Sequence, residues 1–240
     1  MTATKENPII FYDLGDGKGS SWPANTYKTR LTLPEIEPKL KELGVGPTSD
    51  THPRYTLPVI ADPSSDPNGK PTYVAESFAI AAYLDEKYPA PEYPAIFPPG
   101  TRGVQHLLIN QYFPTLNALM GTLLYPKVPQ FFDEKSVEYL RRTRPPETFK
   151  SLAEGEETKK WLEVRDKFID LAKSLDLNRG DLFIIGSQPS FIDFYLGGLF
   201  SVIEKVDDAQ MREIASWHGG RWGNYWGRLR EIEEHSTEVY

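Results

Sequence analysis

A proline placed directly ahead of an apolar, β-branched pair is the feature that most constrains the fold of this chain. Residues 55–60 read Tyr-Thr-Leu-Pro-Val-Ile. Pro58 has no backbone N–H to give to a sheet, so it belongs at the start of a strand, where the Leu57–Pro58 bond is expected to be cis. A cis bond would turn the backbone N–H and C=O of Leu57 outward, where an extended ligand can pair with them.

A second element follows at the pair Glu76-Ser77. Residues 72–75 have the pattern of a strand and residues 77–84 that of a helix, which places Ser77 at the N-cap of the helix. The backbone donors and the positive dipole end of this helix would favour a nearby anion. Together with Leu57, the pair predicts a site that grips the backbone and a carboxylate of a small peptide.

The composition excludes several kinds of chemistry. Cysteine is absent, so the chain has no thiol nucleophile, disulfide or thiolate metal site of its own, and any sulfur chemistry must come from a ligand. The four histidines show no ligand spacing, and neither a metal site nor a hydrolase is expected. A net charge of -7 with scattered basic residues argues against nucleic-acid binding. The sequence lacks a signal-peptide pattern and a long apolar run, so we expect a cytoplasmic protein that does not enter a membrane.

The chain changes in character near Tyr93. Before this point short β-rich runs alternate with helical ones, whereas residues 93–100 are too rich in proline for either element. Beyond residue 100 the pattern is helical almost throughout. We therefore expect an α/β domain over residues 1–92, a linker over 93–100 and an all-α domain over 101–240.

Three helical signals stand out in the second half. The first expected helix has a candidate core face, and Pro114 should kink or end it; the face comprises Val104, Leu107, Leu108, Gln111 and Tyr112. A later helix has an apolar stripe at helical spacing, formed by Trp161, Val164, Phe168, Leu171, Ala172 and Leu175. Ser190 and Asp193 have the spacing of a capping box, which predicts a helix beginning there.

These elements occur in a family-specific order: a strand over residues 9–12, a turn and helix over 20–33, Leu57-Pro58, Glu76-Ser77 and a helical half with the capping box. Over nearly its whole length the chain resembles the cytosolic glutathione transferases. Residues 25–30 and 36–40 look like fungal transferases related to bacterial β-etherases, the fungal-specific class A with ligandin character. The resemblance implies a thioredoxin-like N-terminal domain followed by an all-helical domain.

Glutathione is the co-substrate that the resemblance implies. Leu57 and Pro58 would hold its cysteinyl backbone, and Glu76 and Ser77 its γ-glutamyl end. Such roles are physically reasonable, because the Glu76 carboxylate can take the ligand's ammonium group while Ser77 and the helix N-terminus take its carboxylate.

Activation of the ligand's thiol needs a hydrogen-bond donor near the end of the first strand, since such donors favour the thiolate. The related fungal pattern has a serine where this chain has Pro23. Ser21 is the first candidate for the donor, with Ser20 beside it. The amides and side chain of Asn25 are an alternative, as is weak activation of the thiol. Ser20 and Ser21 could also have only a structural role in the turn and the helix cap.

The spacing after Leu33 departs from the family in a second way. Residues 34–38 follow the expected first helix immediately and leave no room for the second strand of a thioredoxin-like sheet. The explanations are a shortened variant, a sequence that lacks an internal segment, or an error in our alignment. We favour a missing segment of about one turn and one strand.

A second substrate would lie between the domains, and its cleft would be lined by aromatic side chains; the candidates are Tyr12, Trp22, Tyr112, Phe113 and Tyr125. For each of them, packing in the core is the alternative. We expect conjugation of glutathione to electrophilic aromatic molecules in detoxification, with ether cleavage or peroxide reduction as variants. The alternative is a non-catalytic ligandin that binds polyphenols or other small hydrophobic metabolites, and a scaffold without glutathione is a third class. The family implies a homodimer.

Overall fold

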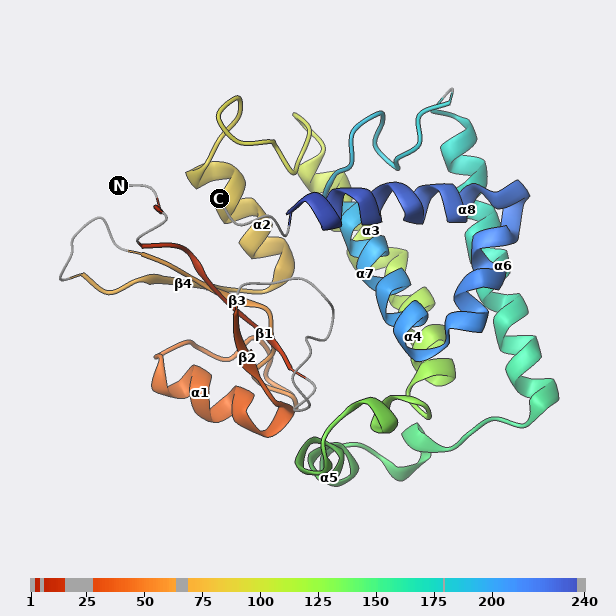
Figure 1. The fold of residues 1–240 in the computed structure, drawn as a ribbon, viewed down its shortest axis with the longest axis horizontal. Coiled ribbons are helices and arrows are strands. Elements are labelled where there is room, and N and C mark those ends of the chain that lie inside the picture. The colour runs from red at the N-terminus through yellow and green to blue at the C-terminus, as the bar shows by residue number, and fades with distance from the viewer. Residues whose placement is uncertain (1–2, 5–6, 16–27, 64–68, 179, 237–240) are drawn as a thin grey trace. The chain divides into compact units, whose positions relative to one another are not determined.

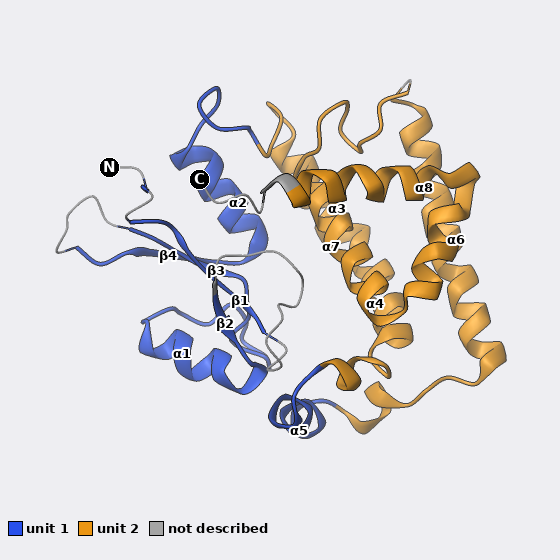
Figure 2. Cartoon of the chain, in the orientation of Figure 1, with its two compact units in different colours: residues 1–95, 132–144, 237–240 blue, residues 96–131, 145–236 orange. Residues whose placement is uncertain are grey.

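The computed structural model describes residues 3–4, 7–15, 28–63, 69–178 and 180–236 (Figure 1). Contacts divide the chain into two compact units (Figure 2). Unit 1 contains residues 1–95, 132–144 and 237–240, and unit 2 contains residues 96–131 and 145–236. Each unit is thus assembled from stretches of sequence that are separated by part of the other unit.

Unit 1 is built on a four-stranded sheet. Its strands are β1 (Ile10–Leu14), β2 (Lys28–Leu31), β3 (Val59–Asp62) and β4 (Thr72–Ala75), in the order β2-β1-β3-β4. β1 runs parallel to β2 and antiparallel to β3, and β3 runs antiparallel to β4. The mixed sheet confirms the expected thioredoxin-like arrangement of the N-terminal half.

The strand β2 corrects the prediction that the second strand is missing. Lys28–Leu31 was expected to be part of a helix, but it pairs with β1 along the edge of the sheet. Arg30 is exposed and Leu31 is buried, so the segment alternates with the period of a strand.

Helices cover the two faces of this sheet (Figure 1). The short 3₁₀ helix η1 (Leu33–Glu35) leads into α1 (Ile36–Glu42), and α2 (Ser77–Lys87) follows β4. The core beneath α1 comprises Tyr12, Leu31, Ile36, Leu40, Val59 and Ala61. Ile60 points to the opposite side of β3, because side chains alternate along a strand, and it is fully buried there.

A further helix of unit 1 comes from the middle of the chain. α5 (Glu134–Thr143) is capped by Asp133, whose carboxylate accepts a 2.8 Å hydrogen bond from the Ser136 N–H. It packs against η1, and the ring of Tyr139 lies 6.2 Å from that of His52.

Unit 2 is helical. Its α-helices are α3 (Arg102–Gln111), α4 (Phe113–Leu124), α6 (Glu154–Asp176), α7 (Phe191–Val206) and α8 (Asp208–Ser236), with 3₁₀ helices η2 (Val128–Phe131) and η3 (Pro146–Phe149). The predicted stripe of α6 is buried as expected. Its Phe168 ring lies 5.7 Å from Phe200 of α7 and 4.9 Å from Trp222 of α8, so aromatic side chains join the three longest helices. Among the described residues, no helix is long and apolar enough to cross a membrane.

The predicted core face of α3 is wrong. Val104 and Leu107 are 47% and 58% exposed, whereas the buried residue of this helix is Gln105. The Gln105 side chain accepts a 2.9 Å hydrogen bond from the Ile192 N–H and donates one of 2.9 Å to the Thr101 hydroxyl. The spacing of apolar residues does not predict the buried face of α3, because a polar side chain, Gln105, lies at the centre of that face with its hydrogen bonds satisfied. The break near Pro114 is confirmed, since α3 ends at Gln111 and α4 begins at Phe113.

α8 is interrupted in its middle. Residues 217–220 leave the helical conformation, and His218, Gly219 and Gly220 have positive φ angles of 52°, 71° and 84°. Glycine adopts such angles without steric cost, so the Gly-Gly pair allows the chain to turn between two helical segments.

Candidate functional site

The strand β3 begins directly after the Leu57–Pro58 bond, which is cis as the sequence predicted. Leu57 packs on the core of the sheet, and Val59 and Ile60 behind it are fully buried. Pro58 thus lies directly ahead of β3, at the start of the strand, where its missing N–H does not disrupt the ladder.

Glu76 lies in the adjacent junction between β4 and α2. Its φ of 77° and ψ of 126° fall in a region that side chains other than glycine rarely occupy. The Glu76 side chain is exposed, and its backbone C=O accepts the first intrahelical bond, 2.8 Å from the Ile80 N–H. Glu76 is therefore the N-cap of α2, one position earlier than the predicted cap at Ser77, and Ser77 is the first helical residue. Backbone strain of this kind tends to occur at binding sites.

Two threonines orient the Glu76 carboxylate. The Thr56 hydroxyl donates to Glu76 Oε1 at 3.3 Å, and the hydroxyls of Thr48 and Thr56 lie 3.0 Å apart. The sequence analysis assigned neither threonine a role. The only available signal was the position of Thr56, two residues ahead of the cis proline.

This junction has the chemistry for a zwitterion. The Glu76 carboxylate attracts a cation, while the Ser77 hydroxyl and the N-terminal amides of α2 attract an anion. Both groups are exposed and adjacent in the chain, so one small ligand can contact both.

The candidates for thiol activation, Ser20, Ser21 and Asn25, and the aromatic candidate Trp22 lie outside the described residues. The last described residue before them is Gly15, whose N–H donates to the Leu31 C=O at 2.9 Å. Their roles stay predictions.

The remaining aromatic candidates have different surroundings. Tyr12 is 6% exposed within the core of the sheet, and burial, followed by the Tyr73 side chain, raises its pKa. Phe113 is 1% exposed in unit 2. The Tyr112 hydroxyl donates to the Lys167 C=O at 2.6 Å, and burial raises the pKa of Tyr112 to about 12. Tyr125, in contrast, is 38% exposed.

Tyr125 lines a cavity of about 400 Å³ whose described walls all belong to unit 2. One wall is the face of α4 that contains Asn117 and Gly121, and Tyr125 follows at the end of this helix. Residues 147–152, between η3 and α6, form the other wall. Within the described ranges, no group of histidine, aspartate and glutamate side chains could hold a metal ion.

The family model "Glutathione S-transferase, C-terminal domain" matches residues 103–231, more than half of the chain. The chain belongs to the glutathione S-transferases.

Similar proteins place this transferase close to fungal ones. It is 29% identical to the glutathione S-transferase-like protein ustS of Aspergillus flavus, over 94% of this chain and 91% of that protein. Among solved structures, the glutathione transferase GSTFuA3 of Phanerochaete chrysosporium is 28% identical with a TM-score of 0.78, covering 93% of this chain and 96% of that one. A glutathione S-transferase of Ceriporiopsis subvermispora, solved in complex with glutathione, is 25% identical with a TM-score of 0.79, covering 97% and 98%. These matches confirm the resemblance to fungal transferases.

The helical half of the transferase contains the predicted capping box at the start of α7. The buried Asp193 carboxylate accepts hydrogen bonds of 2.8 Å from the Ser190 N–H and 2.9 Å from the Ser190 hydroxyl. It also accepts from the Ile184 N–H at 2.8 Å and the Tyr225 hydroxyl at 2.7 Å, two partners that local spacing could not predict. Asp193 thus joins α7, the preceding loop and α8.

Proposed function

We propose that this transferase conjugates glutathione to electrophilic aromatic small molecules. The observation that supports this most directly is the junction at Glu76, whose backbone is strained and whose exposed carboxylate lies next to the N-terminus of α2. The strand β3, which begins after the cis Leu57–Pro58 bond, is adjacent. Glutathione has the matching groups, because its γ-glutamyl end holds an ammonium and a carboxylate on one carbon atom.

In the proposed complex, the Glu76 carboxylate binds the ammonium group of glutathione. The Ser77 hydroxyl and the first amides of α2 bind the adjacent carboxylate. The backbone N–H and C=O of Leu57, set at the start of β3 by Pro58, pair with the cysteinyl residue. These contacts fix the glutathione thiol in one place, which lowers the entropic cost of its reaction.

Ser21 is the proposed donor to the thiol, with Ser20 and Asn25 as the alternatives from the sequence. A donor stabilises the thiolate, which attacks an electrophilic carbon and forms a thioether bond while the leaving group departs with its electron pair. With an aryl ether as substrate this reaction is ether cleavage. With a peroxide, the thiolate would attack oxygen instead, and a second glutathione would complete the reduction.

The test is a calorimetric titration of the protein with glutathione. We expect saturable binding that Glu76→Gln weakens about tenfold or more. The substitution replaces the charged acceptor of the ammonium group with a neutral one, and hydrogen bonds between neutral and charged groups are weaker than those between opposite charges. Glu138→Gln, which changes an exposed acid on α5 of the same unit, is the control and should bind like the wild type. Equal affinity of the wild type and Glu76→Gln would contradict the assignment.

A ligandin without significant turnover is the second candidate function. Pro23 in place of the expected serine supports it, and so does the cavity beside Tyr125. Turnover with an aryl halide separates the two candidates: a loss of turnover in Ser21→Ala with retained glutathione binding supports catalysis. Aromatic binding without any turnover in the wild type favours the ligandin. The homodimer implied by the family is likewise a proposal, which light scattering tests.

A further inference from the structure

A buried carboxylate lies beneath the helix that begins at Glu76. Asp62 is the last residue of β3 and is 2% exposed. Because side chains alternate along a strand, and Val59 and Ala61 belong to the core beneath α1, Asp62 lies on the opposite face of the sheet, where it contacts α2. A buried acid of this kind is costly unless its oxygens accept hydrogen bonds.

Two tyrosines at the end of α2 provide these bonds. The Tyr83 hydroxyl donates to Asp62 Oδ2 at 2.5 Å, and the Tyr88 hydroxyl donates to Oδ1 at 2.8 Å. Burial raises the pKa of both tyrosines, that of Tyr83 to about 12, so both hydroxyls remain donors at neutral pH. The Tyr88 oxygen also accepts a 3.2 Å hydrogen bond from the Ala3 N–H. Tyr83 lies within α2 and Tyr88 is its C-cap residue, so Asp62 fixes the second half of this helix.

The backbone of Glu76 requires that α2 be held in place. Its φ of 77° persists only where the surrounding structure fixes the chain on both sides. Before Glu76, the chain is fixed by the pairing of β4 with β3. After Glu76, it is fixed by α2, whose buried residues are Ile80 and Ala81 and whose remaining anchor on the sheet is the pair of phenols on Asp62.

We infer that Asp62 is a positioning residue for the ligand site at the start of α2. By holding the second half of the helix, it keeps Glu76 and Ser77 in the arrangement that binds a zwitterion. Ser77 precedes Tyr83 by about 9 Å along the helix axis, so a small tilt of the helix displaces the binding groups of its first turn. The effect on glutathione rests on the proposed function, whereas the effect on the first turn needs no ligand.

The first test follows hydrogen exchange in Asp62→Asn without a ligand. Asparagine keeps the size of the side chain, but it has one acceptor oxygen where the carboxylate has two. The Ile80 N–H, which donates to the Glu76 C=O at 2.8 Å, reports the first turn of α2, and the Val45 N–H, which donates to the Leu40 C=O at 2.9 Å, reports general opening of the same unit. We expect the ratio of the Ile80 rate to the Val45 rate to rise about fivefold or more. An unchanged ratio would overturn the inference, because equal acceleration of both amides is a loss of overall stability.

A second variant makes this test independent of one substitution. Tyr83→Phe keeps the carboxylate and its bond to Tyr88 but removes the bond within α2. It should raise the same ratio about twofold or more. Ile36→Val is the control, because it removes a methyl group from the core on the other face of the sheet and should leave the ratio unchanged.

The second test is a calorimetric titration with glutathione in a double-mutant cycle. Asp62→Asn should weaken binding about fivefold in the wild-type background and by less than about threefold in Glu76→Gln, where part of the positioned contact is already lost. Ile36→Val should bind like the wild type. Equal weakening in both backgrounds, or unchanged affinity of Asp62→Asn, would contradict a positioning role. Absence of glutathione binding in the wild type would reject the proposed function instead, and the exchange rates would still decide the role of Asp62.

Discussion

The indole N–H of Trp222 donates a 2.8 Å hydrogen bond to Nδ1 of His218, at the interruption of α8. Trp222 is fully buried, and its ring lies 4.9 Å from Phe168. His218 can accept this bond only while Nδ1 carries no proton. The turn between the two segments of α8 is therefore coupled to the charge of one imidazole.

The stability of the protein should consequently fall on mild acidification. Burial, then the neighbouring Arg221 and Arg165, lower the pKa of His218 below its usual 6.5, against an opposing effect of Asp176. A lowered folded-state pKa means that the folded protein favours the neutral imidazole. The stabilisation that the neutral imidazole provides is therefore complete above about pH 6.5 and is lost as the pH falls through the folded-state pKa. Melting temperatures measured from pH 8 to pH 5 test this at about half-unit steps.

His218→Asn should remove that acid-dependent loss, because asparagine tolerates a positive φ but does not titrate. The control is His106→Asn, at an exposed position on α3, which should keep the wild-type pH profile. An acid-dependent loss that persists unchanged in His218→Asn would show that another group is responsible.

Replacing Asp193 should destabilise the helical unit strongly. Asp193→Asn leaves four donors sharing one carbonyl oxygen, from Ser190, Ile184 and Tyr225, and we expect a loss of about 3 kcal/mol in the free energy of unfolding. Ser190→Ala removes one hydroxyl and should cost about 1 kcal/mol. Urea unfolding measures both, and the exposed Asp166→Asn on α6 should change the free energy by less than about 0.5 kcal/mol.

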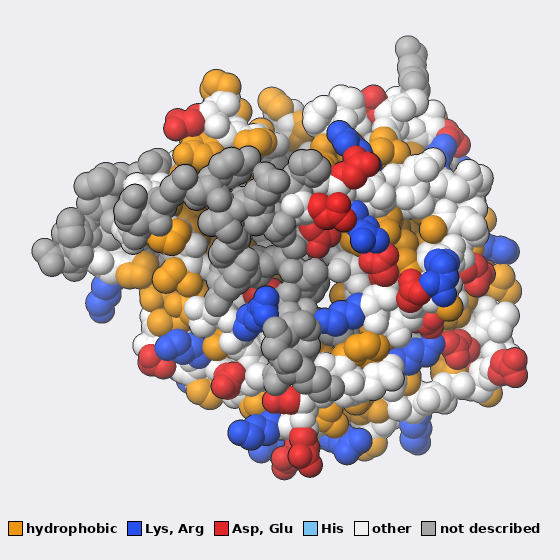
Figure 3. Space-filling view, viewed as in Figure 1, with side chains coloured by type: hydrophobic (Ala, Val, Ile, Leu, Met, Phe, Trp, Pro, Cys, Tyr) orange, Lys and Arg blue, Asp and Glu red, His pale blue; other side chains and the backbone are white. Residues whose placement is uncertain are grey.

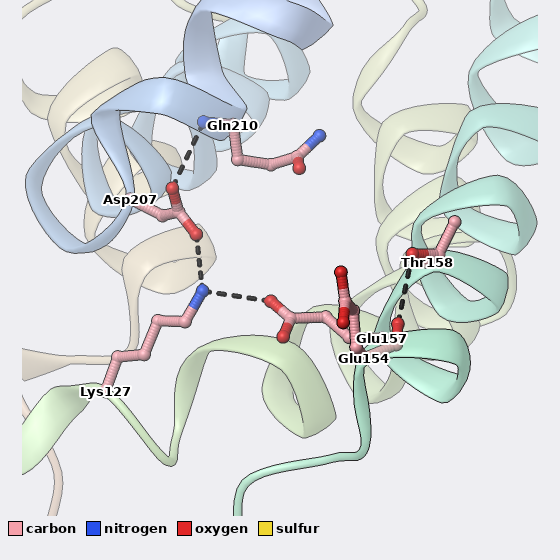
Figure 4. Close-up of polar contacts among 6 residues, drawn as sticks. All are labelled: Lys127, Glu154, Glu157, Thr158, Asp207 and Gln210. Atoms are coloured by element: carbon pink, nitrogen blue, oxygen red, sulfur yellow. Dashed lines mark hydrogen bonds and ion pairs between the residues drawn. The ribbon is translucent and has the colours of Figure 1, made fainter.

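Lys127 joins three helices through two carboxylates (Figure 4). Its ammonium group lies 2.5 Å from Asp207, between α7 and α8, and 3.0 Å from Glu157 in the first turn of α6. Burial alone would lower the pKa of Lys127, but the hydrogen bonds to Asp207 and Glu157 outweigh it and raise the pKa. Because the folded-state pKa is raised, the stabilisation is present below about pH 10.5 and is lost at higher pH.

Lys127→Met should therefore cost about 1 kcal/mol at neutral pH, and the difference from the wild type should shrink above pH 10.5. The comparison is Lys160→Met, which breaks a single pair with Glu163 three residues away on the same helix and should be nearly neutral. Charges of both signs are interspersed on the face shown in Figure 3. Equal losses in the two variants would contradict a special role for Lys127.

Glu76→Gly should separate stability from ligand binding. Glycine adopts a φ of 77° freely, so the free energy of unfolding of this variant should be about 1 kcal/mol higher than that of the wild type. It should also lose glutathione affinity, because the carboxylate is gone. Glu76→Gln is the matched variant, with the same loss of charge but no relief of the backbone, and thermal melts with and without glutathione compare the two.

Local chemistry explains which parts of the fold could be predicted from the sequence. The start of β3, the stripe of α6 and the capping box of α7 each depend on a few neighbouring residues whose properties leave little choice. β2 was missed because it has only four residues, at an edge of the sheet, where a strand pattern hardly differs from the end of a helix. The buried face of α3 was missed because Gln105 is held there by Ile192, from a helix far along the chain.

The candidate site divides in the same way. The cis Leu57–Pro58 bond and the junction at Glu76-Ser77 could be predicted because a proline ahead of an apolar pair and a strand-to-helix pattern are visible in sequence. Thr48 and Thr56, which orient the Glu76 carboxylate, lie in an irregular segment and become neighbours of Glu76 only in the folded sheet. Spacing along the chain carries no information about such contacts.

The position of α5 limits how this protein could be divided. Residues 132–144 belong to the unit that contains the sheet and pack on η1, although they follow α3 and α4 of the other unit in the sequence. A fragment that stops at residue 95 would leave the surface of η1 uncovered, and the complementary fragment would carry a helix separated from its packing partner. If two related genes recombined at the linker, η1 would come from one parent and α5 from the other, and their packing surfaces would not match. We therefore expect the two halves of the chain to be inherited together.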